Sequence, residues 1–164
     1  MSFNKRLCFL YTQATHDTHK TNDDITKKNL FCFARPISIN YMVGYVKNNE
    51  FVLENKVNKN VKPNTLKNFE TIIQELKNDI KNVDIIVSHN ADFHIKTIIA
   101  ESLKYNIMID FNKYVIVDTM SFYHDYNLLD LKDLATKINI EYNEDHLELV
   151  QNVFFKLYLK SQSK

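Results

Sequence analysis

Histidine is the side chain in this sequence best suited to metal binding, and His94 and His146 could in principle share a zinc ion, which imidazole binds well. Two ligands do not complete a zinc site, so His16 or an acidic residue would have to join them. The cysteines offer no substitute, because Cys8 and Cys32 lack metal-type spacing and lie in the apolar stretches RLCFLY and LFCFA. We expect two buried thiols in a reducing compartment, and we favour polar, cleft-lining roles for His94 and His146 over a zinc site.

Glycine is almost absent: Gly44 is the only one among 164 residues. One glycine is too few for a P-loop, a G-x-G-x-x-G dinucleotide motif or a G-x-S-x-G nucleophile elbow, so these classes of site are excluded. Turns that need a positive φ are expected to use asparagine, the next most tolerant residue.

The overall charge points to no particular partner. The formal net charge is +1 and the pI is about 7.7, which gives no general attraction to nucleic acid or to a membrane. The apolar stretch near the N-terminus is too short for a signal peptide or a membrane span, so we expect a cytoplasmic protein with no membrane partner.

The hydrophobic pattern predicts a mixture of strands and helices. Short apolar or β-branched runs indicate strands at residues 6–13, 37–46, 51–57, 84–87 and 114–117. Apolar residues at helical spacing indicate helices over residues 66–80, 91–103, 131–138 and 149–158. Asn64 is the predicted cap of the first helix and Asp130 lies near the start of the third, while the polar stretch 16–29 is expected to be an exposed loop.

The order of these elements predicts the fold class. Three strands come first, the second and third joined as a hairpin, and helices then alternate with single strands. Such an order is typical of an α/β protein with a central mixed sheet of about five strands flanked by helices. Without repeats, linkers or shifts in composition, residues 1–164 are expected to form a single domain.

One segment resembles a known family. The stretch DIIVSHNADFHIKTIIAESLKYNI is similar to the second motif of the DnaQ-like, DEDDh-type 3′–5′ exonucleases, in which a strand ends in His-Asn-Ala, then one residue, then Phe-Asp, before a helix. His89, Asn90, Ala91 and Phe93 match that motif. Three other segments resemble family regions in the right order: FLYTQATH, YVIVDTMSFYHDYNLLDLKDLATKINIEY and EDHLELVQNVFFKLY. The resemblance implies an RNase H-like fold over nearly the whole chain.

The family's chemistry depends on four carboxylates, which hold two divalent ions about 4 Å apart, and on a histidine that acts as the general base. In the alignment that the resemblance implies, the histidine is retained as His146. The residues at the four carboxylate positions are Tyr11, Gln13, His94 and Gln151. The resemblance also places Thr12, His89, Asn90 and Phe93 along the cleft. Hard ions such as Mg²⁺ need anionic oxygen ligands, so hydrolysis by the family mechanism is not expected.

Nearby acids do not restore the missing set. Asp92 is two residues before His94 and so projects about 200° away from it on the helix. Asp17, Asp145 and Glu148 are scattered over the other motifs, and none completes a cluster of three or four carboxylates. Asp118 matches a family residue that is not a metal ligand, and we interpret it as a hydrogen-bonding residue at a strand end.

We therefore expect a catalytically degenerate exonuclease-like protein with no cofactor. It would act by binding single-stranded DNA or RNA ends, or a replication or repair protein. Tyr11 could stack on a base or sugar, although filling the space left by lost metals is the simpler role. The alternatives are an active 3′–5′ exonuclease with an unconventional Mg²⁺ or Mn²⁺ site, with His146 as its base, and a purely structural or interaction subunit.

Overall fold

The computed structural model describes residues 5–15, 24–26, 29–48, 50–62, 65–122 and 129–162. The strands are β1 Arg6–Ala14, β2 Pro36–Lys47, β3 Glu50–Asn60, β4 Ile85–Ser88 and β5 Val115–Asp118. The α-helices are α1 Leu66–Asp79, α2 Ala91–Lys104, α3 Leu131–Lys137 and α4 His146–Gln162. Two short 3₁₀ helices, η1 Leu30–Cys32 and η2 Thr119–Phe122, lie between them.

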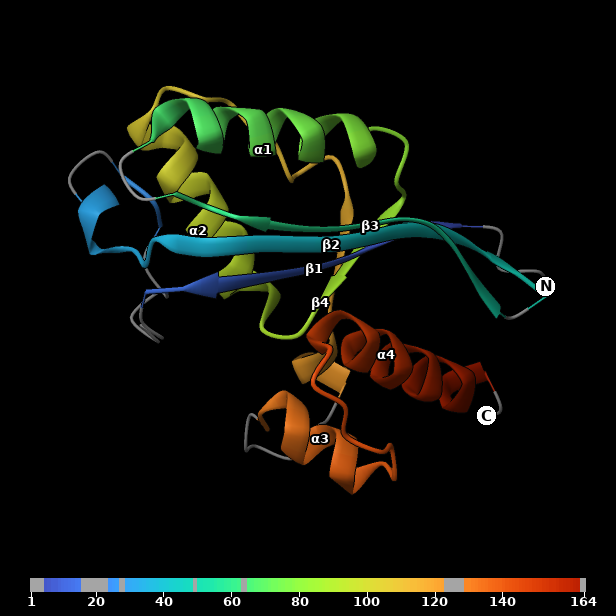
Figure 1. Ribbon diagram of the computed structural model, residues 1–164. Coiled ribbons are helices and arrows are strands. Elements are labelled where there is room, and N and C mark those ends of the chain that lie inside the picture. Colours follow the sequence, from blue (N-terminus) through green and yellow to red (C-terminus); the bar gives the residue numbers. More distant parts are fainter. Residues whose placement is uncertain are drawn as a thin grey trace.

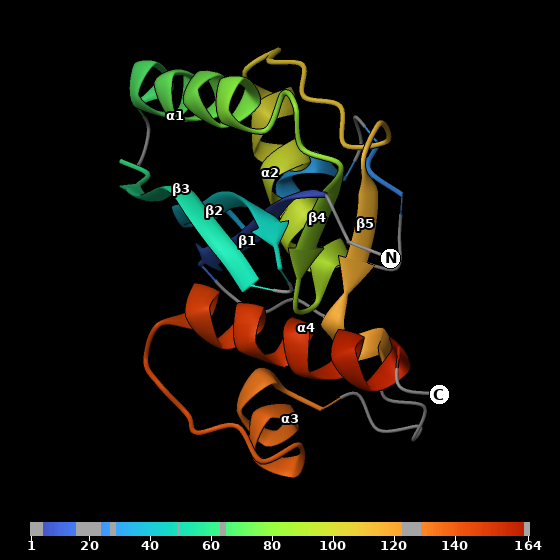
Figure 2. The ribbon, with the colours of Figure 1, turned by 90° about the vertical axis from the view of Figure 1, so that its right-hand side faces the viewer.

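The five strands form one mixed sheet in the order β3-β2-β1-β4-β5 (Figure 1). The first three strands are antiparallel neighbours, and β1 continues into the parallel pairs β1–β4 and β4–β5. Helices α1 and α2 cover one face of the sheet, and α3 and α4 lie on the other (Figure 2). The predicted α/β architecture, with a mixed five-stranded sheet flanked by helices, is confirmed.

The alternating side chains of β1 build both hydrophobic cores. Cys8 and Leu10 point to the α1/α2 face and belong to a fully buried cluster with Ile73 of α1. Leu7 and Phe9 point to the opposite face, where they pack with residues of α3 and α4. A strand that is apolar on both sides has to lie inside the sheet, as β1 does.

Buried charge holds α2 to the loop before β2. Glu101 of α2 is 1% exposed and accepts hydrogen bonds from the guanidinium of Arg35 at 2.8–3.3 Å and from Nζ of Lys104 at 3.0 Å. Burial pushes the pKa of Glu101 upward, but the two cations more than offset this and hold it below its usual value. The carboxylate is therefore ionised and paired.

Asparagine supplies every positive φ in the described part of the chain, as predicted, at Asn48, Asn90, Asn106 and Asn139. Asn48 is in the β2–β3 turn. Asn106 and Asn139 follow the ends of α2 and α3, and the next residue in each case donates back to the helix, from Ile107 to Ser102 at 2.9 Å and from Ile140 to Ala135 at 2.8 Å. This hydrogen-bonding pattern commonly ends helices and usually uses glycine.

One prediction about an individual residue is wrong, and two others fall largely or wholly outside the described residues. Cys8 is fully buried, and burial raises the pKa of its thiol, but Cys32 is exposed, so the prediction of two buried thiols is wrong for Cys32. Cys32 is the last residue of η1, where the following Phe33 and Ala34 take the buried positions. The predicted cap Asn64 and most of the predicted loop at 16–29 lie outside the described residues; the residue before α1 is Thr65.

Gly44 sits at an irregularity in the β2–β3 pairing where no side chain fits. A Cβ at this position would collide with the backbone oxygen of Val52 and would lie 2.6 Å from a ring carbon of Phe51. We expect Gly44→Ala to lower the free energy of unfolding by about 2 kcal/mol, because the backbone of β3 would have to shift. Urea denaturation would measure this, with Lys47→Ala, a change at an exposed residue of the same strand, as the control. An unchanged midpoint for Gly44→Ala would show that the strand pair adjusts without cost.

Candidate functional site

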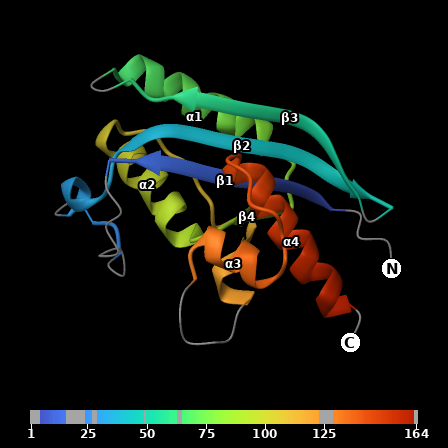
Figure 3. The same cartoon turned by 60° about the horizontal axis from the view of Figure 1, so that its bottom comes forward.

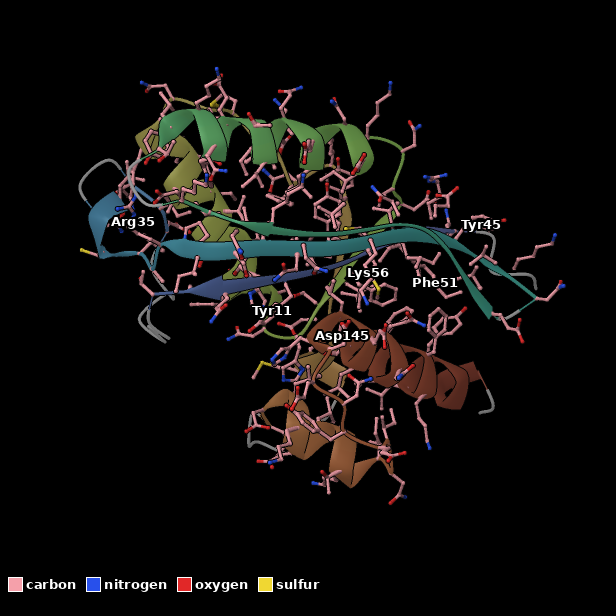
Figure 4. The ribbon with its side chains drawn as sticks, in the orientation of Figure 1. Tyr11, Arg35, Tyr45, Phe51, Lys56 and Asp145 are labelled. Carbon is pink, nitrogen blue, oxygen red and sulfur yellow. The ribbon has the colours of Figure 1, made fainter. Side chains whose placement is uncertain are left out.

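Three aromatic side chains from distant segments meet where β1, α2 and α4 converge. The ring of Tyr11 stacks on the imidazole of His146, the first residue of α4, with centroids 4.5 Å apart and planes 6° from parallel. Its centroid lies 5.1 Å from that of His94, in the first turn of α2. Figure 3 shows the N-terminal end of α4 lying over β1, and Figure 4 shows Tyr11 between the sheet and this end of α4.

His94 is a buried, neutral link between β1 and α2. Its Nδ1 accepts the backbone N–H of Thr12 at 3.1 Å and lies 2.8 Å from the hydroxyl of the same residue, which is therefore assigned as a donor. Burial lowers the pKa of His94 to about 4, although a hydrogen bond to the backbone of His89 acts in the opposite direction. With Nδ1 committed to Thr12, this side chain holds the end of β1 against α2.

His89 is likewise buried, and its ring joins two later segments of the chain. Nδ1 lies 2.8 Å from the hydroxyl of Thr119, and Nε2 lies 3.0 Å from the backbone oxygen of Leu129. Burial lowers the pKa of His89, so its ring is neutral. Since Nε2 faces a carbonyl oxygen, it carries the proton, and Nδ1 accepts from the hydroxyl of Thr119. His89 therefore connects the end of β4 to the segments that lead into α3.

Asp118, at the end of β5, organises the start of α2. Its carboxylate accepts the backbone N–H groups of Asn90 at 2.9 Å, Ala91 at 2.8 Å and Met120 at 2.9 Å. Asn90 takes a left-handed conformation with φ of 63°, which turns the chain from β4 into the helix. The interpretation of Asp118 as a strand-end hydrogen-bonding residue is confirmed.

An ion-pair cluster holds the start of α4 on the sheet. Nζ of Lys56, on β3, lies 2.6 Å from Asp145 and 2.8 Å from Glu148. Asp145 also accepts the backbone N–H groups of Leu147 and Glu148, which caps the helix. Burial raises the pKa of Asp145, but Lys56 and these backbone N–H groups together lower it overall. Asp145 and Glu148, one on each side of His146 in the sequence, are thus held by a lysine.

Beside the ring stack is a hollow of about 340 Å³. It is lined by Tyr11, Gln13, Asn40, Asn58, Glu144, Asp145, His146 and Leu147. Amides, carboxylates and two rings surround it, and none of these lining residues is a lysine or an arginine. A larger hollow of about 880 Å³ lies between α2 and β5 with a mostly apolar lining, and none of the predicted site residues lines it.

The structure brings some of the predicted site residues together and separates others. Tyr11, Gln13 and His146 line the smaller hollow, and Thr12 and His94 are buried next to it. Phe93 is buried with its ring centroid 5.2 Å from that of His94. The remaining predicted residues are outside the lining: His89 and Asn90 contact β5 and η2, and Gln151 is half-buried further along α4. His16 lies outside the described residues.

Other residues of the hollow were not predicted. Asn40 and Asn58 enter it through strand register, since Tyr11 pairs with Asn40 and Asn40 pairs with Asn58. Lys56 is outside the lining and contacts it through its ion pair with Asp145. The alternation of polar residues in β3 was a usable signal, but register between strands is not visible in one sequence. Asp92 projects outward and pairs with Lys96 at 2.9 Å, in keeping with its predicted direction.

Two kinds of feature are absent from the described residues. No group of three or more histidine, cysteine, aspartate or glutamate side chains is arranged to hold a metal ion among these residues. None of the helices in the described ranges is long and apolar enough to cross a membrane.

Comparison with known proteins supports the fold. No family model and no curated protein matches the sequence. Among solved structures, the chain is similar to a 3′-exonuclease from a study of 3′-end specific recognition of the histone mRNA stem-loop. The TM-score is 0.67 at 10% sequence identity, over 99% of this chain and 84% of that one. The chain therefore has an RNase H-like, exonuclease-type fold.

Asp118 provides a test of the local architecture. Asp118→Asn replaces one acceptor oxygen with an NH₂ group that faces backbone donors, so we expect a loss of about 2 kcal/mol in the free energy of unfolding. Asp110→Asn is the matched control, because Asp110 is exposed and accepts a single backbone N–H, that of Asn112. Chemical denaturation of both variants measures the difference, and equal losses would contradict the role given to Asp118.

His94 predicts a pH dependence of stability. Its pKa is lowered from 6.5 to about 4 on folding, so the unfolded chain binds more protons between these values and stability falls as pH decreases through this range. The slope contributed by this one group is at most about 1.4 kcal/mol per pH unit. We expect His94→Gln to flatten the slope in urea unfolding series, without abolishing it because His89 has the same sign.

The matched control is Phe93→Leu, a destabilising change in the adjacent buried residue that removes no titratable group. It should lower stability at every pH and keep the slope. An identical slope in wild type and His94→Gln would show that His94 is not the titrating group.

Proposed function

We propose that this protein binds the 3′-hydroxyl end of single-stranded RNA or DNA and does not hydrolyse it. The observation that carries the proposal is the parallel stack of Tyr11 and His146 beside the polar hollow. His146 is exposed, so its side chain is accessible to a ligand from solvent. A terminal base can extend such a stack, and base–aromatic stacking contributes about 1–3 kcal/mol per base.

The similarity of fold supports the class of ligand. The similar structure is a 3′-exonuclease whose study concerns recognition of an RNA 3′ end. The ring stack lies at the end of β1 and the start of α4, the two elements on which the family resemblance places the first-motif acids and the general base. A single-stranded end is therefore the ligand that best suits this position.

The side chains around the stack favour binding over metal-dependent hydrolysis. Tyr11, Gln13, His94 and Gln151 bring no negative charge to the positions that the resemblance assigns to metal ligands. Three nearby carboxylates have other partners: Asp145 and Glu148 pair with Lys56, and Asp118 binds backbone N–H groups. Glu144 alone does not make a metal site. Divalent ions such as Mg²⁺ need several oxygen ligands, and this set provides few.

The charge around the hollow favours a 3′-hydroxyl over a 3′-phosphate. Glu144 and Asp145 belong to its lining, and no cationic side chain does. Because Asp145 is paired with Lys56, Glu144 supplies the negative charge of the lining. Carboxylates accept hydrogen bonds from sugar hydroxyls but repel a terminal phosphate. The end would thus enter with base and sugar inward and its phosphates outward.

Hydrolysis is tested first. Purified protein is incubated with 5′-labelled single-stranded RNA and DNA in Mg²⁺ or Mn²⁺, and the products are resolved on denaturing gels. We expect no shortening from the 3′ end. Reproducible 3′ shortening that is lost in His146→Ala would favour an active exonuclease with an unconventional metal site and would overturn the proposal.

Binding is then measured by fluorescence anisotropy with the same oligonucleotides. If His146 is a stacking platform, His146→Phe should bind about as well as wild type, whereas His146→Ala should bind about 10-fold more weakly. Tyr45→Leu is the control, since Tyr45 lies in the same sheet at the far end from Tyr11 (Figure 4). An oligonucleotide with a 3′-phosphate should bind more weakly than its 3′-hydroxyl counterpart. Absence of binding to every end would leave a protein-binding or structural subunit as the function.

A further inference from the structure

Three amide side chains lie together on the sheet face beside the ring stack. Strand register pairs Tyr11 with Asn40, and Asn40 with Asn58, so these residues form one row across β1, β2 and β3. Gln13 is two residues beyond Tyr11 and therefore on the same face. Gln13, Asn40 and Asn58, here named the amide cluster, all line the hollow that Tyr11 and His146 also line.

The amide cluster has unused hydrogen-bonding capacity. Nδ2 of Asn40 donates to the hydroxyl of Ser38 at 2.9 Å, which orients that amide. Within the described part of the chain, the amides of Gln13 and Asn58 form no hydrogen bond, and both residues are exposed. Each amide offers a donor and an acceptor side by side on a rigid sheet, which suits recognition of a planar, polar edge.

The negative charge beside the amide cluster favours a ligand that carries an amino group. Glu144 lines the hollow with the amide cluster and is exposed, and its carboxylate accepts hydrogen bonds from amino groups while disfavouring carbonyl oxygens. Among nucleobases, adenine and cytosine present an amino donor next to a ring-nitrogen acceptor, and on adenine asparagine and glutamine bind this kind of edge in bidentate fashion. Uracil and thymine present carbonyl oxygens and have no amino group.

We propose that the amide cluster reads the edge of the 3′-terminal base and prefers adenine to uracil or thymine. The inference rests on the proposed function, because the base has to stack on His146 to bring its edge to the amide cluster. Stacking on the platform supplies affinity for any base, and the amides supply the preference. Asn58 is the main selective residue, because its amide has no partner among the described residues and lies in the row with Tyr11 and Asn40, whereas Gln13 lies near the end of β1.

The experiment measures anisotropy with 5′-labelled single-stranded oligonucleotides that differ only in the 3′-terminal base. We expect an adenine end to bind about 10-fold more tightly than a uracil or thymine end. Asn58→Ala should reduce this ratio toward one and leave the affinity for the uracil end unchanged, and Gln13→Ala should reduce it in part. Asn152→Ala, an exposed change on α4 away from the hollow, is the matched control and should keep the ratio.

The outcomes separate this inference from the function on which it rests. Equal affinity for all four ends, lowered by His146→Ala, would overturn the base preference and keep the binding proposal. A preference that persists in both Asn58→Ala and Gln13→Ala would also overturn the role of the amide cluster. Absence of binding to any end by wild-type protein would overturn both proposals. Thermal unfolding of each variant checks that the fold is retained.

Discussion

The pleat of β1 is the constraint on which the rest of the structure depends. Its side chains alternate between the two faces of the sheet, so Cys8 and Leu10 enter one core while Leu7 and Phe9 enter the other. The same alternation continues beyond the cores. Thr12 turns toward α2 and binds His94, and Tyr11 turns toward α4 and stacks on His146. A change of register by one residue would exchange both cores and dismantle the site in one step.

Neutrality is the common property of the groups around the site. Burial lowers the pKa of His89 and His94, so both are uncharged near neutral pH, and each uses its ring nitrogens for internal hydrogen bonds. Three acids in the same region are held by Lys56 or by backbone N–H groups. These contacts connect β1, β4, β5 and α2 without requiring an ion. Buried polar groups that are all satisfied contribute rigidity, and here they fix the position of the exposed rings.

The two proposals divide recognition between two kinds of contact. The exposed ring of His146 offers dispersion and stacking, which are tolerant of sequence. The amides of Gln13, Asn40 and Asn58 offer directional hydrogen bonds, which discriminate between base edges. Phosphate contacts, which usually dominate affinity for nucleic acid, have no cationic partner among the residues that line the hollow. Binding of this type would favour a chain end over a continuous strand, since a base can enter only where its sugar and phosphates can turn outward.

The sequence by itself determined the fold class and the strand and helix order, because hydrophobic periodicity is local and every long helix and strand carries it. It also determined that asparagine takes the positive φ positions and that Asp118 serves the backbone at a strand end. Only the tertiary structure decided that Cys32 is exposed and that Lys56 neutralises Asp145. The meeting of Asn40 and Asn58 with Tyr11 was equally beyond the sequence. Those outcomes depend on strand register and on the placement of α4, which arise from long-range packing that no local pattern encodes.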